Sequence, residues 1–196
     1  MMTFPLHLRF KLIAVASQIE VTDAQGGPVF YVKQKAFKLK EAVTVYRDST
    51  QGQVLYRIAA DRVLDILAQY AITEAGGSPL GVLQRHGMRS LWRAHYEIHQ
   101  AGRPLFVIRE ENPWTKVFDA IFGSIPILGL FAGYLFHPAY LVSAPNDEGP
   151  ILRVTKEPAL FEGRFRIEAV KPLTGTPAEL AVVSVLMMLL FERAKG

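Results

Sequence analysis

Two hydrophobic patterns follow each other along the chain, and together they predict a sheet that surrounds a helix. Through the first 110 residues, short stretches of alternating apolar and polar positions are separated by turns rich in Gly, Asp and Pro. This alternation is typical of antiparallel strands joined in a meander. It returns at 151–156 and 160–170, whereas Leu180 to Phe191 is apolar at every position except Ser184.

The alternation places most strands but leaves two stretches less regular. Residues 6–21 alternate imperfectly, and residues 62–73 fit a helix before running into a Gly-rich turn at 74–79. The clearer strands are expected at 29–33, 42–47, 53–58, 80–85, 90–99 and 103–110, with 42–47 and 53–58 forming a hairpin.

The C-terminal segment predicts a buried helix over residues 177–193. Thr176 is the expected N-cap, with Pro177 at the first helical position and Glu179 in the first turn. The apolar residues 180–191 would cover about 18 Å at about 1.5 Å per residue, whereas a bilayer core needs about 20 residues. A helix that is apolar on every side must be surrounded on every side. We therefore expect this helix to lie inside the protein and not in a membrane.

A second apolar block, residues 113–142, predicts a helical insertion. Asn112 and Pro113 form a helix start, no formal charge occurs from Ala120 to Asn146, and Pro126 interrupts the block. Three interpretations fit: a single transmembrane helix, a hairpin that lies in or on one leaflet, and a surface packed against protein. A single crossing would put the early strands and the core helix on opposite sides of the bilayer. We therefore favour the hairpin.

The insertion supplies the residues that we expect to contact a membrane or a partner. Trp114, Tyr134 and Tyr140 suit a water–lipid boundary. The full set of expected contact residues is Trp114, Phe118, Phe122, Ile127, Leu128, Phe131, Tyr134, Leu135 and Phe136.

Basic residues gather in three groups, and the first is the best candidate for anionic headgroups. Each Lys or Arg near an anionic membrane contributes about 1 kcal/mol to binding; the alternative is an ordinary charged strand. The first group is Lys33, Lys35, Lys38 and Lys40, and together with Lys116 these lysines are the headgroup candidates. The second group is Arg85, Arg89 and Arg93, and the third is Arg153, Lys156, Arg164 and Arg166.

Composition and charge limit the number of domains, the kind of partner and the compartment that we expect. The 196 residues suit one domain, 1–196, and the net charge of +4 favours anionic partners. The absence of cysteine excludes disulfides and thiolate metal sites. The N-terminus lacks the pattern of a signal peptide, so we expect a cytoplasmic protein, peripheral at the inner face of a membrane. Nucleic acid is not favoured, because no aromatic platform stands apart from the core pattern.

Catalytic signatures are not found. The chain contains no Walker loop, GxGxxG, HExxH or GxSxG motif, so we expect neither an enzyme nor a cofactor. His95, Glu97 and His99 would share one face of a strand and are weak candidates for a metal site. The alternative is that they form part of the solvated face.

Short motifs add a family resemblance. Tyr31 to Glu41 (YVKQKAFKLKE), Thr44 to Tyr46 (TVY), Gly52 to Leu55 (GQVL) and Glu162 to Glu168 (EGRFRIE) resemble the LURP-one-related proteins, which belong with tubby C-terminal domains and phospholipid scramblases. The resemblance implies a mainly β protein: a closed antiparallel barrel of about twelve strands around a central C-terminal helix, with no free sheet edge.

The resemblance also implies a function. We expect a non-catalytic, membrane-associated lipid-binding or scaffold protein of the scramblase or tubby-like type, whose partner is an anionic lipid surface. The alternative is a soluble oligomerisation or scaffold module in which residues 113–142 pack against another protein chain or a second copy.

Overall fold

The computed structural model describes residues 2–13, 16–35, 43–60, 69–85, 94–111, 139–147, 149–158 and 163–195. This part of the chain forms twelve strands and one helix. They are β1 (Leu6–Ile13), β2 (Ala16–Thr22), β3 (Pro28–Lys35), β4 (Val43–Tyr46), β5 (Val54–Ala60), β6 (Gln69–Glu74), β7 (Pro79–Arg85), β8 (His95–Gln100), β9 (Arg103–Glu110), β10 (Ala139–Ser143), β11 (Pro150–Glu157), β12 (Gly163–Ala169) and α4 (Gly175–Lys195).

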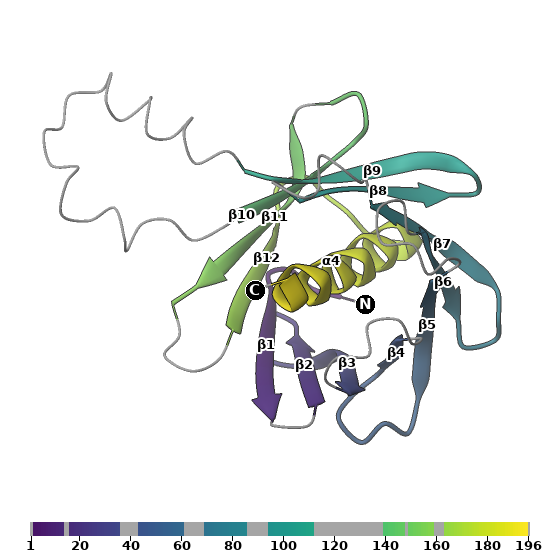
Figure 1. Ribbon diagram of the computed structural model, residues 1–196. Helices are drawn as coiled ribbons and strands as arrows, with labels where there is room; N and C mark the ends of the chain where they lie inside the picture. The colour runs from purple at the N-terminus through teal and green to yellow at the C-terminus, as the bar shows by residue number, and fades with distance from the viewer. Residues whose placement is uncertain are drawn as a thin grey trace, which may run out of the picture.

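The strands form a closed antiparallel barrel in which each strand pairs with its neighbours in sequence. The barrel closes between β1 and β12, where Leu6 lies opposite Ile167. Figure 1 shows the strands arranged around α4, which runs through the middle. Closure leaves none of these strands with an unpaired edge. The predicted fold class, a mainly β closed barrel around a C-terminal helix, is confirmed.

Helix α4 provides the centre of the core. Every residue from Leu180 to Phe191 is buried, including Ser184, and the inward side chains of the barrel strands pack around them. By length and composition, Gly175–Arg193 could cross a bilayer, but 72% of its apolar stretch is buried. The predicted interior position is therefore confirmed by burial. The helix has 21 residues, so the prediction that it is too short to span a bilayer was wrong.

The predicted start of the helix also needs correction. The helix begins at Gly175, so Thr176 is not the residue before it, and Pro177 lies inside the first turn. Proline is tolerated there because its nitrogen would have no intrahelical acceptor. Glu179 lies one residue beyond the first turn, which contains no acidic residue. Its carboxylate instead accepts a hydrogen bond from the Tyr56 hydroxyl at 2.7 Å.

Glycine allows α4 to approach the barrel wall closely. A Cβ atom at Gly81, on β7, would lie 2.6 Å from the His99 carbonyl oxygen and 2.7 Å from Leu180 Cδ2. Real Cβ atoms essentially never make contacts this short. Any larger residue at position 81 would therefore push β7 away from β8 and from the Leu180 side chain.

Both of the less regular stretches contain strands. Residues 6–21 divide into β1 and β2, and the end of the ambiguous stretch 62–73 belongs to β6. The predicted insertion 113–142 extends too far, because Ala139–Ser143 is β10. Tyr140 on this strand is only 7% exposed and belongs to the core cluster, so its predicted place at a lipid boundary was wrong.

Helix α4 runs from one end of the barrel to the other, and different links between strands lie at the two ends. Tyr56, near the start of β5, bonds to Glu179 near the start of the helix. Tyr96, near the start of β8, donates to Glu192 near the end of the helix at 2.7 Å. We call the end with Tyr56 and Glu179 the turn end, because the short links β2–β3, β4–β5, β6–β7, β8–β9 and β10–β11 lie there. The other is the insertion end, where β9 ends and β10 begins.

Candidate functional site

The expected membrane contacts lie outside the described residues. Trp114, Phe118, Phe122, Ile127, Leu128, Phe131, Tyr134, Leu135 and Phe136 belong to the stretch 112–138, as does Lys116, and Lys38 and Lys40 belong to 36–42. What the structure gives is the attachment of this stretch. Glu111 is the last described residue before this stretch and Ala139 is the first after it, and Glu111 N donates to Ala139 O at 2.7 Å. The role of the expected membrane-contact residues therefore stays a prediction.

Two residues of the first lysine group lie on a described strand that ends at the insertion end. Lys33 and Lys35 lie on β3, which starts at the turn end and finishes at the insertion end. Lys33 is exposed on the outer side of the barrel. Its position is compatible with an anionic surface that approaches this end.

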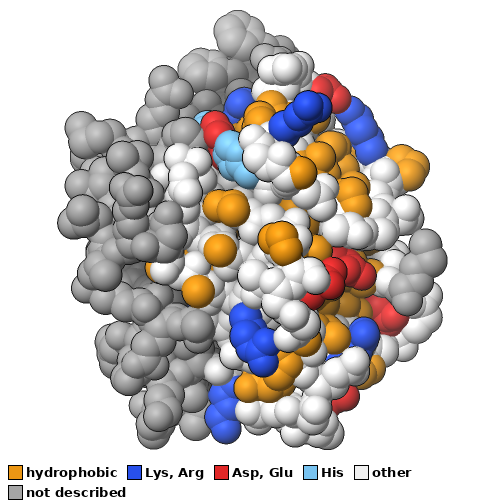
Figure 2. Space-filling view, turned by 90° about the vertical axis from the view of Figure 1, so that its right-hand side faces the viewer, with side chains coloured by type: hydrophobic (Ala, Val, Ile, Leu, Met, Phe, Trp, Pro, Cys, Tyr) orange, Lys and Arg blue, Asp and Glu red, His pale blue; other side chains and the backbone are white. Residues whose placement is uncertain are grey.

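The third basic group is interleaved with acidic side chains. Arg153 Nη2 lies 2.8 Å from a Glu111 carboxylate oxygen, and Arg166 Nη2 lies 3.2 Å from Glu168. Arg164 faces Glu157 across the β11–β12 ladder. On the face that Figure 2 shows, basic and acidic side chains are likewise interspersed with apolar ones. Such a mixture is typical of a solvated strand face, so this group is a poor anion site.

The histidine triplet occupies the outer face of β8, as its alternation predicts. Tyr96 and Ile98 are fully buried, whereas His95, Glu97 and His99 are partly exposed. His99 Nε2 lies 3.2 Å from a Glu97 carboxylate oxygen. Within the described ranges no group of three His, Asp or Glu side chains is arranged to hold a metal ion. The triplet gives no support to a metal-dependent enzyme.

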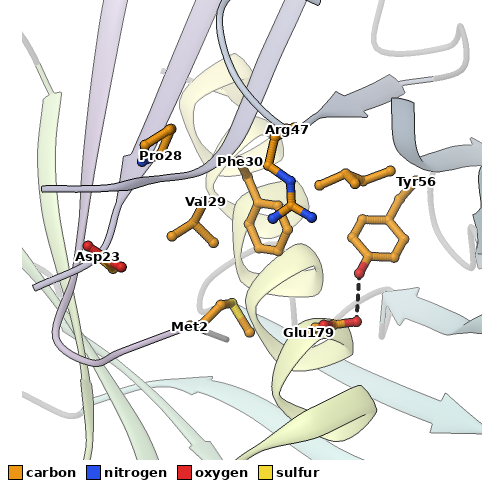
Figure 3. Close-up of a pocket in the computed structure, with 9 residues that line it drawn as sticks. Met2, Asp23, Pro28, Val29, Phe30, Arg47, Tyr56 and Glu179 are labelled. Carbon is orange, nitrogen blue, oxygen red and sulfur yellow. Dashed lines mark hydrogen bonds between the residues drawn. The ribbon is translucent and has the colours of Figure 1, made fainter. Parts of the chain in front are cut away.

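A pocket that the sequence did not predict opens at the turn end, beside the start of α4 (Figure 3). Its volume is about 330 Å³, at the lower limit of the roughly 300–1,000 Å³ typical of small-molecule sites. The apolar lining consists of Met2, Pro28, Val29, Phe30 and Leu55, and the polar lining of Asp23, Arg47, Tyr56 and Glu179.

Tyr56 and Glu179 form the inner polar wall of the pocket. Tyr56 is 7% exposed, and its ring meets Phe30 edge to face with centroids 5.9 Å apart. Burial, followed by the Glu179 carboxylate that accepts its hydrogen bond, raises the pKa of Tyr56 well above its usual value. At neutral pH the hydroxyl is therefore a fixed donor, which holds one carboxylate oxygen of Glu179 in place.

The other two charged side chains differ in how they are used. Asp23 Oδ1 accepts the backbone N–H groups of Gln25 at 3.0 Å and Gly27 at 2.8 Å, so it stabilises its own turn. Arg47 is exposed, and its guanidinium has no hydrogen bond or ion pair to any residue in the described part of the chain. Figure 3 shows it reaching over the same opening that Glu179 lines.

Sequence reasoning missed this pocket because its residues come from four separate places in the chain. Asp23 begins a turn, Arg47 was interpreted as the last residue of the strand 42–47, and Glu179 as a charge that favours the helix start. The pairing of Tyr56 with Glu179 spans 123 residues. No local pattern signals a contact of that kind.

Comparison with known proteins identifies a family model over most of the barrel. The LURP-one-related model matches residues 28–157, which run from the start of β3 to the end of β11. No protein with a curated description matches the chain, and no solved structure matches it.

Proposed function

Because the chain belongs to the LURP-one-related family, we propose that it is a non-catalytic lipid-binding protein that docks on an anionic membrane surface through its insertion end. Membership of this family suggests a tubby-like lipid-binding fold. In this proposal the apolar residues between Pro113 and Pro138 enter the interface, and lysines around that end attract the headgroups. The protein is peripheral at the cytoplasmic face.

The burial of α4 is the observation that carries the proposal. The chain has two long uncharged blocks, and α4 accounts for one of them as barrel core. The second block lies in sequence between β9 and β10, whose paired ends meet at the insertion end. Because α4 supplies the centre of the core, the second block is the apolar segment that we assign to the membrane contact.

Vesicle flotation tests the proposal with a deletion that respects the barrel. Residues 113–138 are replaced by a short Gly-Ser linker, so that β10 and its pairing with β9 and β11 remain. We expect the wild-type chain to float with phosphatidylserine-containing vesicles and the deletion variant to stay at the bottom of the gradient. Equal flotation of the two chains, or flotation of neither, would refute membrane docking through this segment.

Charge reversal measures the electrostatic contribution to membrane binding. Lys33→Glu with Lys35→Glu is expected to lower binding to anionic vesicles by at least about 2 kcal/mol, near 30-fold, because each change removes a cation that contributes about 1 kcal/mol and adds a carboxylate that the surface repels; the loss should be larger at low salt. Arg103→Glu is the matched control, since Arg103 is exposed at the turn end. A control that weakens binding as much as the lysine pair would contradict the proposed orientation.

The same deletion tests the soluble alternative. If residues 113–138 pack against a second copy, the wild-type chain sediments as an oligomer without detergent, and the deletion variant sediments as a monomer. That result without flotation would identify an oligomerisation module.

A further inference from the structure

We propose that the pocket at the turn end binds a small zwitterion, with an ammonium group directed to Glu179 and an anionic group directed to Arg47. The pocket is distinct from the proposed membrane contact, because it opens at the opposite end of the barrel. The inference does not depend on lipid docking.

The charges of the lining argue for a ligand of both signs. Glu179 and Asp23 disfavour a simple anion, and Arg47 disfavours a simple cation. Among the described residues no ion pair joins Arg47 to Glu179, although both line the same opening. A ligand that carries an ammonium and an anionic group satisfies both side chains at once, and charge-assisted hydrogen bonds of this kind are the strong ones.

The hydrogen-bond capacity of each side chain fits this arrangement. One Glu179 carboxylate oxygen accepts the Tyr56 hydroxyl, which leaves the other oxygen to accept from an ammonium group. The Arg47 guanidinium can donate two parallel bonds to a carboxylate or phosphate. Asp23 contributes less, because its Oδ1 already holds two backbone N–H groups.

The remaining wall is apolar and pre-formed. Val29 and Phe30 are 5% and 4% exposed, and the Phe30–Tyr56 ring contact fixes the inner surface. A cavity of about 330 Å³ suits a molecule of amino-acid or headgroup size. Free amino acids and the headgroup of phosphatidylethanolamine both carry this chemistry.

Calorimetric titration of the full chain provides the test, with three probes of one shape. L-leucine carries both charges, 3-methylbutylamine carries the ammonium alone, and 4-methylpentanoate carries the carboxylate alone. We expect L-leucine to bind at least about tenfold more tightly than either analogue, since each lacks one charged contact. Glycerophosphoethanolamine is titrated in parallel, and tighter binding of this probe than of L-leucine would identify a headgroup as the natural source.

Two variants remove one charge each while keeping the shape. Arg47→Gln and Glu179→Gln are each expected to weaken the bound zwitterion about tenfold or more. Glutamine at position 179 still offers an oxygen to Tyr56, so folding is preserved. Arg103→Gln, exposed at the same end of the barrel, is the control and should change nothing.

Three results of the titrations would overturn the proposal. The proposal fails if neither zwitterion binds at about 10 mM, which corresponds to about 2.7 kcal/mol. It also fails if a singly charged analogue binds as well as L-leucine, or if both glutamine variants bind like the wild-type chain. Since these readouts involve no vesicles, their failure leaves the flotation result untouched.

Discussion

Replacing Leu189 by Asp tests whether α4 is the core of the barrel or a membrane anchor. Leu189 is 3% exposed and belongs to the central cluster. Loss of its buried surface costs about 1.5–3 kcal/mol, and burying an unpaired polar group in its place costs a further 2–7 kcal/mol, roughly. The sum, about 4–10 kcal/mol, is comparable with the whole stability of a typical domain, about 5–15 kcal/mol.

We therefore expect Leu189→Asp to be largely unfolded in dilute buffer. Urea titration followed by far-ultraviolet circular dichroism is the assay. Leu189→Ala gives a graded measurement: it should remain folded and lose about 2–5 kcal/mol. Val170→Asp is the matched control, because Val170 is 53% exposed, and its cost should stay within about 0.5 kcal/mol.

A membrane anchor would behave differently in the same experiments. If α4 held the protein on lipid, Leu189→Asp would stay folded with a wild-type urea midpoint and would lose flotation. A soluble, folded Leu189→Asp variant would refute the interior position of the helix and, with it, the argument that residues 113–138 are the membrane contact.

Three further predictions follow from the interior. Ser184→Ala should raise stability by about 1 kcal/mol in urea titration, since the fully buried Ser184 hydroxyl has no hydrogen-bond partner among the described residues; a clear loss of stability would mean that the hydroxyl is bonded. Gly81→Ala should lower the free energy of unfolding by about 1–3 kcal/mol. Leu180→Ala should cost less stability in that variant than in the wild-type chain, because the shortened side chain relieves part of the clash at position 81. Strictly additive costs of the two substitutions would contradict this contact. Burial raises the pKa of Tyr140 to about 12 and that of Tyr56 further, so both should ionise last in an absorbance titration. Their contribution to stability is full below the unfolded pKa near 10 and is lost as pH rises through the folded values, whereas ionisation near pH 10 would show that they are exposed.

The sequence predicted the parts of the fold that depend on one segment at a time. A run such as Leu180 to Phe191, which is apolar at every position but one, is stable only in the interior, and burial of every residue confirms that prediction. The hairpin at 42–47 and 53–58 is confirmed as β4 and β5, with Val43 opposite Ile58. The strand predicted at 103–110 matches β9.

Features that depend on distant partners could not be predicted in this way. Tyr140 looks like an interfacial aromatic residue, and only the placement of β10 beside β9 and β11 turns it inward. Glu179 looks like a helix-start charge until Tyr56 is brought beside it. Closure of the barrel through Leu6 and Ile167 is likewise invisible to local periodicity, and the family resemblance supplied it.

The order of the elements has a consequence for how the protein is made. Helix α4 follows the twelve described strands in the sequence, so each of them leaves the ribosome before the segment around which it packs. β1 must also wait for β12, its neighbour in the closed barrel. Until α4 emerges, the inward side chains of the strands have no partner and expose aggregation-prone surface. Chaperone capture of the nascent barrel should therefore persist through translation of β12, and a stop codon placed just before Gly175 should yield a folding failure instead of a shortened barrel.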